Sequence, residues 1–367
     1  MKKTQETISP AWRWLGVITL PLALVILFQW LKGNQSLMTK WVFGVMAPTE
    51  QFLGRLWAVF PFSVAELLTV LFLTGCLVWL IRAVVLVWRQ KKLLPLLRRL
   101  AALAAAWLWL WAGLCWLWNA AYYASSFTQR SGLEVRPYSV EELAAVTEHF
   151  ALQAARLAPQ VRRDEELHFA ENLPRCFAQN SEVYQELTRE FPCLSMEPVS
   201  AKPMYLFSRL QSILGFTGMY FPFTGEANVN IDAPACLVPA TIAHEMAHQR
   251  MVASELEANF VGIAACASCE DPVFQYSGYL MGLIQLCNAL YSAAPDRWYA
   301  IAEEFFTPEL AADWRDNNEY WAALSSPVED AAGEVYDSFL KSNDQQLGIR
   351  SYGACVDLLV HYFGEKV

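Results

Sequence analysis

Three apolar runs in the first third of the chain constrain its fold more than any other feature. They cover residues 14–31, 64–88 and 100–118, and each approaches the roughly 20 residues that an α-helix needs to cross the hydrocarbon core of a membrane. The chain is 55% hydrophobic and 17% charged, and the apolar excess lies in this third. Runs of this length are hard to explain as the core of a soluble protein, so we expect three transmembrane helices.

The first run could instead belong to a signal peptide, because the basic residues Lys2, Lys3 and Arg13 precede it. The run is longer than the apolar part of most signal peptides, and residues 32–35, Lys-Gly-Asn-Gln, offer no small-residue cleavage site. We therefore expect an uncleaved first span.

The distribution of positive charge orients these predicted spans. Six Lys and Arg residues lie from Arg82 to Arg99 with no acidic residue among them, and loops of this kind stay in the cytoplasm. With the amino terminus also in the cytoplasm, three spans place everything after Asn119 on the other side. We expect a multi-pass protein of the cytoplasmic membrane, with a membrane domain over residues 1–120 and an extracytoplasmic domain over residues 121–367. The bilayer is an expected partner and nucleic acid is not, because the net charge is −9 and no other stretch is basic.

The second informative stretch is residues 244–248, which read His-Glu-Met-Ala-His. On a helix, His244 and His248 leave the same face one turn apart and can hold one metal ion, for which zinc is the natural choice. Glu245 lies beside that face, where a carboxylate can take a proton from a water molecule at the metal. We predict that Glu245 is the general base.

A catalytic zinc ion needs a third protein ligand and one open position. In an unbroken helix Glu255 would lie about 16 Å along the axis from His244 and out of reach, so the helix must end soon after His248. Ser254 and Glu257 have the spacing of a capping box for a new helix. Glu257 would then be occupied at the cap, which leaves Glu255 for the metal.

The break itself leaves this choice open. A glycine is expected where a helix must end so abruptly, but Met251 stands there. Either Glu255 or Glu257 can therefore complete the site. Asn259, one turn after Glu255, is placed to orient a ligand.

The histidine pair followed by E-x-x-A-N at residues 255–259 resembles the gluzincin metallopeptidases. The resemblance implies three zinc ligands, His244, His248 and Glu255. It also implies that Glu245 is the base and that Asn259 is the partner that orients a ligand.

More narrowly, the chain resembles an uncharacterised family of bacterial membrane proteins that is described only as a domain of unknown function. The matching segments are residues 218–230, the run His-Glu-Met-Ala-His-Gln-Arg, residues 276–279 and residues 351–353. Together with the three spans, the likeness covers most of the chain. It implies a zincin-like site and no particular substrate.

Residues 204–208, 218–223 and 226–231 read as strands, with a turn between the last two. In metallopeptidases of this build a strand beside the zinc helix pairs with the extended substrate, as a sheet edge can. We expect residues 226–231 to be that strand, so its polar side chains are candidates to bind substrate: Glu226, Asn228 and Asn230. Ordinary polar residues of a hairpin explain them equally well.

The remaining segments predict helices. Ser63 with Glu66 has the spacing of a capping box at the start of the second apolar run, and Ser139 with Glu142 has the same spacing for a helix to about residue 158. The chain reads as helical from residue 260 to its end. Three tyrosines are candidates to steady an oxyanion, although packing explains each one singly: Tyr276, Tyr279 and Tyr352. A disulfide between Cys176 and Cys193 is left open by the sequence.

The sequence thus predicts a mainly α protein. Three transmembrane helices precede a zincin-like α+β domain with a small sheet and a helical C-terminal subdomain. The predicted function is zinc-dependent hydrolysis of peptide bonds in a peptide or protein on the outer side of the membrane. The alternative is a catalytically inactive, membrane-anchored binding or scaffold protein with a structural metal site.

Overall fold

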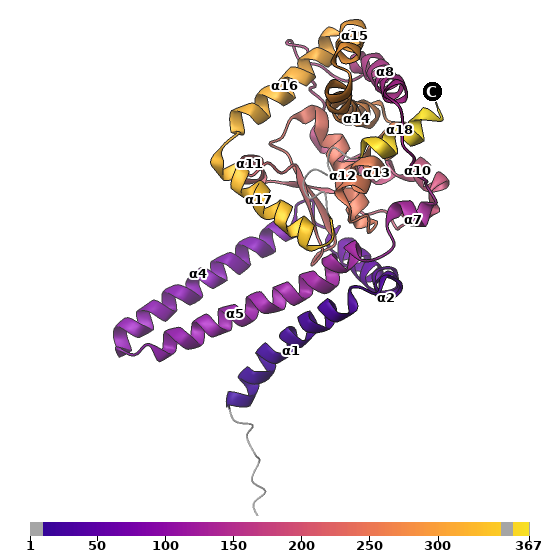
Figure 1. Cartoon of the computed structure of the whole chain (residues 1–367). Helices are drawn as coiled ribbons and strands as arrows, with labels where there is room; N and C mark the ends of the chain where they lie inside the picture. Colours follow the sequence, from indigo (N-terminus) through magenta and orange to yellow (C-terminus); the bar gives the residue numbers. More distant parts are fainter. Residues whose placement is uncertain (1–9, 346–354, 367) are drawn as a thin grey trace, which may run out of the picture.

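The computed structural model describes residues 10–345 and 355–366. Figure 1 shows a mostly helical body from one end of which three helices project: α1, α4 and α5. The helices of this end are α1 (Pro10–Leu31), α2 (Gln35–Trp41), α3 (Ala47–Trp57), α4 (Val64–Gln90), α5 (Leu94–Leu114) and α6 (Ala120–Tyr122). A π-helical turn, Cys115–Asn119, joins α5 to α6.

Two of the described helical segments are long and apolar enough to cross a membrane, Val64–Gln90 and Leu96–Tyr122, with 27 residues each. The prediction of three spans was wrong in its count. The described apolar part of the first helix, Gly16–Leu31, falls short of 18 residues, and about 20 are needed to span the hydrocarbon core.

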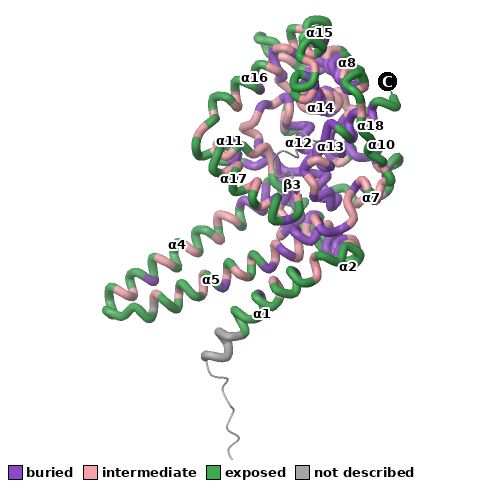
Figure 2. The backbone as a smooth tube through the Cα atoms, viewed as in Figure 1, coloured by how far each residue is buried: buried purple, intermediate pink, exposed green. Residues whose placement is uncertain are grey.

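Helix α1 nevertheless packs along α5. The indole N–H of Trp109 donates to the carbonyl of Val17 at 3.1 Å, and that of Trp116 donates to the carbonyl of Leu24 at 3.0 Å. Figure 2 shows that α4, α5 and the part of α1 after residue 15 are exposed or half-buried over most of their length. Large apolar side chains therefore cover the outside of this end of the molecule.

The body contains the remaining helices and one sheet. The helices are α7 (Phe127–Ser131), α8 (Val140–Leu157), α9 (Leu173–Gln179), α10 (Gln185–Glu190), α11 (Ser208–Ile213), α12 (Val238–Gln249), α13 (Glu255–Ser268), α14 (Pro272–Ala293), α15 (Pro295–Phe305), α16 (Pro308–Leu324), α17 (Pro327–Ser342) and α18 (Val356–Gly364). Helix α12 packs between the sheet and α13, and α13, α14 and α8 follow in turn. The main apolar core lies among these helices. The prediction of a mainly α chain with a small sheet is confirmed, whereas the boundary at residue 120 stays a prediction.

The sheet has three strands in the order β1-β3-β2. They are β1 (Lys202–Met204), β2 (Gly218–Phe221) and β3 (Glu226–Asn230). Strand β3 is parallel to β1 and antiparallel to β2. The predicted hairpin of residues 218–223 and 226–231 is therefore confirmed, whereas the strand predicted over residues 204–208 overlaps β1 only at Met204, because a bend and the start of α11 follow. The edge assignment was also wrong. Strand β3 is the central strand, and both of its edges are already paired.

Serine caps predicted from the sequence start two of the helices. The Ser139 hydroxyl accepts from the backbone N–H of Glu142, and the Glu142 carboxylate accepts from the N–H of Ser139, which is a complete capping box. Ser63 caps α4 by accepting from the N–H of Glu66 at 3.1 Å, but the predicted capping box is incomplete, because the Glu66 carboxylate accepts from residues 205–207 instead. All nine cysteines are free, so Cys176 and Cys193 do not form a disulfide.

Two glutamates tie the start of α4 to the body. The Glu226 carboxylate accepts from the backbone N–H of Val64 and Ala65 at 3.2 and 2.8 Å, and from the Lys202 ammonium at 2.6 Å. The Glu66 carboxylate accepts from three successive backbone N–H groups in the loop after β1, those of residues 205–207, at 2.8 to 2.9 Å. An anionic side chain at a helix N-terminus also interacts favourably with the helix dipole. Helix α4 is thus bonded directly to the sheet.

We expect Glu226→Ala to lower the free energy of unfolding by about 3–5 kcal/mol, because it leaves the Lys202 ammonium buried without its counter-charge. The ion pair is almost fully buried, with side-chain exposures of 6% and 0%. The measurement is denaturant unfolding of the detergent-purified protein, followed by circular dichroism. Glu186→Ala is the control, because its partner Arg189 is 66% exposed and such pairs contribute at most about 1 kcal/mol. Equal losses in the two variants would contradict the role given to Glu226.

Candidate metal centre

The two halves of the predicted motif are brought together by a sharp helix end. Helix α12 ends at Gln249, and Met251 adopts a left-handed conformation with a φ of 60°. The backbone N–H of Val252 then donates to the carbonyl of Ala247 at 3.2 Å. The position where the sequence lacks the expected glycine therefore still has positive φ. The Met251 side chain is buried in an apolar cluster, which offsets the cost of this conformation.

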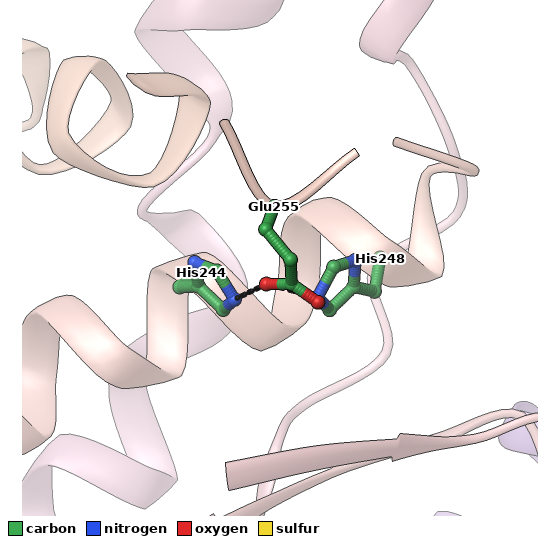
Figure 3. Close-up of side chains that lie close together, drawn as sticks. All are labelled: His244, His248 and Glu255. Carbon is green, nitrogen blue, oxygen red and sulfur yellow. Dashed lines mark ion pairs between the residues drawn. The ribbon is translucent and has the colours of Figure 1, made fainter. Parts of the chain in front are cut away.

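The chain next turns back so that α13 lies against α12. Gly262 on α13 permits this contact, because a Cβ atom there would lie 2.8 Å from the backbone nitrogen of His244 and 3.0 Å from its Cα. Ser254 occupies the N-cap of α13. Glu255 is the first residue of the helix and points back at the histidines of α12 (Figure 3).

The resulting group consists of His244, His248 and Glu255. Glu255 Oε2 lies 3.3 Å from His244 Nε2 and 3.7 Å from His248 Nε2. All three residues are buried, and one potential ligand atom of each lies within 4.8 Å of the others. Tetrahedral ligands with bonds of about 2.0–2.1 Å lie roughly 3.3–3.4 Å from one another. The spacing therefore suits a single metal ion.

The hydrogen bond of His248 sets its tautomer. His248 Nδ1 lies 2.7 Å from the carbonyl oxygen of Val252. Because a carbonyl only accepts, Nδ1 must donate, and the neutral ring then carries its lone pair on Nε2. Val252 lies in the turn after α12, so the same turn that places Glu255 also prepares His248 as a ligand.

The pKa values of Glu255 and His248 favour the protonation states that metal binding requires, whereas at His244 burial is outweighed by the hydrogen bond and charge of Glu255, which raise its pKa. Burial raises the pKa of Glu255, but the charge of His248 and the charge and hydrogen bond of His244, together with the Tyr336 hydroxyl, outweigh it and lower the pKa to about 2. Burial lowers the pKa of His248 to about 4, against the opposing charge of Glu255. The carboxylate is thus ionised and this imidazole is neutral at pH 7.

Glu245 differs from Glu255. Burial raises its pKa to about 8, because the nearby charge of His244 compensates only in part. Within the described part of the chain, Glu245 Oε2 is buried without a hydrogen-bond partner, and the contacts of Glu255 Oε2 are its ion pairs with the two histidines. Buried acceptors are rarely left unpaired. A cation and its water would satisfy both oxygens.

Glu257, the competing glutamate, has other partners. Its carboxylate accepts from the backbone N–H groups of Phe127 and Thr128 at 2.8 and 2.9 Å, and from the Thr128 hydroxyl at 2.8 Å. It therefore caps α7. The Ser254 side chain makes no capping hydrogen bond, so the predicted capping box was wrong although Glu257 is indeed engaged away from the histidines. Asn259 is buried on α13 and interacts with the His244 side chain.

The structure does not bring the other predicted polar residues to this group. Glu226 caps α4, as described above. The Asn228 amide donates to the carbonyls of Met219 and Glu226 at 3.3 and 3.0 Å, and the Asn230 amide donates to Ser212 Oγ at 2.8 Å. Their amide donors are used inside the protein, which is the ordinary structural role that the sequence left open.

Two of the tyrosines predicted to steady an oxyanion are engaged elsewhere, and the third, Tyr352, lies outside the described residues. The hydroxyl of Tyr276 donates to the Asp313 carboxylate. The Tyr279 ring packs edge-on against Phe150 of α8, with ring centroids 5.1 Å apart. These contacts are those of packing residues.

Three aromatic residues from distant segments approach the group instead. The Tyr336 hydroxyl of α17 donates to Glu255 Oε1 at 2.5 Å. The Trp118 ring, at the end of the α5 segment, lies edge-on to the His248 ring with centroids 5.4 Å apart. Tyr122 interacts electrostatically with Glu255. No local pattern in the sequence indicates these contacts, because each joins segments far apart in the chain.

Gly218 of β2 lies against the predicted base. A Cβ atom at this position would be 2.7 Å from Glu245 Cγ and 2.8 Å from its Cδ. The missing side chain therefore makes room for the Glu245 carboxyl beside the outermost strand of the sheet.

We expect Tyr336→Phe to weaken zinc binding by about 10–100-fold, the usual effect of removing a hydrogen bond that orients a metal ligand. The affinity is measured by competition with a chelator. Tyr320→Phe on the preceding helix α16 is the matched control. Its hydroxyl bonds Ser212 and Asp232, so its loss should leave the affinity unchanged. An unchanged affinity in the Tyr336 variant would show that Glu255 needs no support.

Residues 42–360 match the family described as Protein of unknown function (DUF3810). The match covers both long apolar helices and the whole His244, His248 and Glu255 group. No curated protein and no solved structure matches the sequence.

Proposed function

The chain belongs to the family of proteins of unknown function DUF3810, and we propose that its His244, His248 and Glu255 group binds zinc for the hydrolysis of peptide bonds outside the cytoplasmic membrane. Two imidazoles and one carboxylate are the protein ligands of several catalytic zinc sites. The group contains three potential ligands among the described residues, and a tetrahedral ion would keep one open position. A closed structural site would normally supply a fourth ligand, and the obvious candidate, Glu257, is bonded to α7.

The observation that carries the proposal is the buried carboxyl of Glu245, whose Oε2 has no hydrogen-bond partner among the described residues. Glu245 lies beside the group but is not one of the three residues that could hold the ion. A purely structural site has no use for a second buried carboxyl at this place, whereas a hydrolase needs a base there.

Zinc bound here would polarise the scissile carbonyl and make water more acidic. Glu245 takes a proton from the attacking water and later donates it to the leaving amine. A divalent cation beside Glu245 also lowers the pKa of its carboxyl, which keeps the base ionised near neutral pH. Tyr336 holds Glu255 in place, and His248 is held by the carbonyl of Val252.

Strand β2 takes over the role that the sequence gave to β3. It is the last strand in the order β1-β3-β2, so its outer edge is not paired with another strand of the described sheet. Its first residue, Gly218, lies against Glu245. A substrate backbone added along this edge, as in other peptide complexes of sheet edges, would pass the base in an extended conformation.

The basic end of the α4 and α5 pair supports an external site. Residues 82–99, which cover the end of α4, the short connection and the start of α5, contain six positive charges and no acid, so this end of the helix pair is cytoplasmic. The start of α4 and the end of the α5 segment then lie on the outer side, where both contact the body. This placement depends on the α4 and α5 pair and does not need a third span.

The experiment measures zinc per molecule and peptide hydrolysis in the detergent-purified protein. We expect about one zinc per chain, and hydrolysis of a peptide mixture that is lost on chelation and restored by added zinc. Product peptides are identified by mass spectrometry. Zinc without hydrolysis would support a structural metal in a scaffold protein, and neither zinc nor hydrolysis would refute the proposal.

A further inference from the structure

We infer that the substrate is a polypeptide anchored in the same membrane and cut within a few residues of the bilayer surface. The inference rests on the proposed peptidase function and adds to it a substrate class. Four features of the structure support the inference. Two helices indicate where the membrane boundary lies, one strand leads from the metal group toward that boundary, and an apolar surface lies beside the strand.

The first helix that indicates the position of the membrane is the apolar segment Leu96–Tyr122, which contains most of α5. Its last basic residue is Arg99, and no charged residue follows up to Trp118. At 1.5 Å per residue this stretch is about 28 Å long, close to the roughly 30 Å of a hydrocarbon core. Trp118 therefore lies at the outer interface, where tryptophan is favoured. Its ring centroid is 5.4 Å from that of His248, so a metal ligand lies at the level of the membrane surface.

Helix α4 gives the same position for the outer membrane boundary. From Arg82 back to Val64 the helix is about 27 Å long. Its outer end is bonded to Glu226, the first residue of β3. If α4 or α5 is tilted, each residue rises less along the membrane normal and more residues are needed to cross the membrane. The outer membrane boundary then lies still closer to the body. Two independent helices thus place the sheet and the metal group at one interface.

Strand β2 connects the metal group to the outer end of α4. Gly218 at its start lies against Glu245, and Phe221 at its end pairs with Glu226, which caps the outer end of α4. The turn after β2 continues toward the membrane, because its Phe223 ring lies against α5: a Cβ atom at Gly113 would be 2.7 Å from that ring. Gly113 precedes Trp118 by more than one helical turn on the membrane side. The edge of β2 therefore runs from the base to the lipid.

The surface beside β2 has the character of a membrane-facing surface. A hollow between α4 and the sheet is lined by Ala65 and Thr69 of α4 and by Met219 and Phe221 of β2. Met219 is 46% exposed, and Tyr205 and Leu206, in the loop held by Glu66, are 62% and 63% exposed. An extended polypeptide along β2 would cross this surface with its anchored end at Phe221.

These positions give the reach of the site. Phe221 lies three residues along the strand from Gly218, which is about 10 Å of extended chain. An anchored substrate therefore presents to Glu245 a bond about three residues from the membrane-facing end of β2.

The test uses the full-length protein with zinc, reconstituted in vesicles of phosphatidylethanolamine and phosphatidylglycerol. One substrate carries an apolar anchor helix followed directly by a test segment of varied sequence. A second has a Gly-Ser spacer between the anchor and the segment, and a third is the segment without an anchor. Each cut bond is located by mass spectrometry, and the Glu245→Gln protein gives the background.

We expect cuts next to the anchor in the first substrate. The spacer should move the cuts off the test segment and lower its cleavage at least about tenfold, because a displaced bond no longer meets the base. The segment without an anchor should be cut at least about tenfold more slowly. Cuts at the same test-segment residues and at the same rate, with or without the spacer, would overturn the inference and leave the peptidase intact. Absence of zinc-dependent and Glu245-dependent cleavage in all three substrates would refute the proposed function and the inference together.

Discussion

Glu245→Gln is expected to reduce peptide hydrolysis by about 10²–10⁴-fold, the range for the loss of a general base, while zinc remains bound. Glutamine keeps the size and planarity of the side chain, so the contact with Gly218 is preserved. It has no carboxylate to accept a proton from water. Glu245 is not among the three residues that could hold a metal ion, and the zinc content should therefore equal that of the unchanged protein.

The measurement compares turnover, zinc per molecule and circular dichroism in the two proteins. Glu186→Gln, on the surface of α10, is the matched control and should leave all three unchanged. Turnover that persists in the Glu245 variant would disprove its role as base. Loss of zinc together with turnover would mean that this carboxylate is a ligand after all.

The second large effect separates the two glutamates of α13. Glu255→Ala is expected to weaken zinc binding by at least about 100-fold, because it removes one of three ligands and leaves two buried imidazoles facing a void. Glu257→Ala should keep the metal. It instead removes the acceptor for the N–H groups of Phe127 and Thr128, and lowers stability by about 1–3 kcal/mol.

Zinc affinity by chelator competition and the midpoint of thermal unfolding together distinguish the two variants. Each variant serves as the control for the other, since the two residues are neighbours on one turn of α13. Metal loss in the Glu257 variant with retention in the Glu255 variant would reverse the ligand assignment.

What the sequence predicted well was local. The histidine spacing, the Ser63 and Ser139 caps and the hairpin near residues 218–230 depend on residues within one or two turns of each other. The metal group needed one further step, the forced end of α12 after His248. That end was inferred from the distance between His244 and Glu255, and the structure has it at Gln249, with the left-handed turn at Met251.

What the sequence missed was the choice of partner. The sequence suggested a local cap for two glutamates, Glu66 and Glu257, and a place at a sheet edge for Glu226. Each of them instead accepts from backbone N–H groups in another segment. A carboxylate can accept from any unpaired donor that folding brings near. The position of a glutamate in the sequence therefore shows which local partners it could have, but not which partner it has in the fold. The same holds for Tyr336, which reaches Glu255 across 81 residues of chain.

The bond between Glu226 and the start of α4 also has a consequence for synthesis. Helix α4 is synthesised 161 residues before the carboxylate that caps it, so the N–H groups of Val64 and Ala65 have no partner from β3 until that strand is made. A fragment that lacks α4 would remove both of these donors, and Glu226 would keep its ion pair with Lys202.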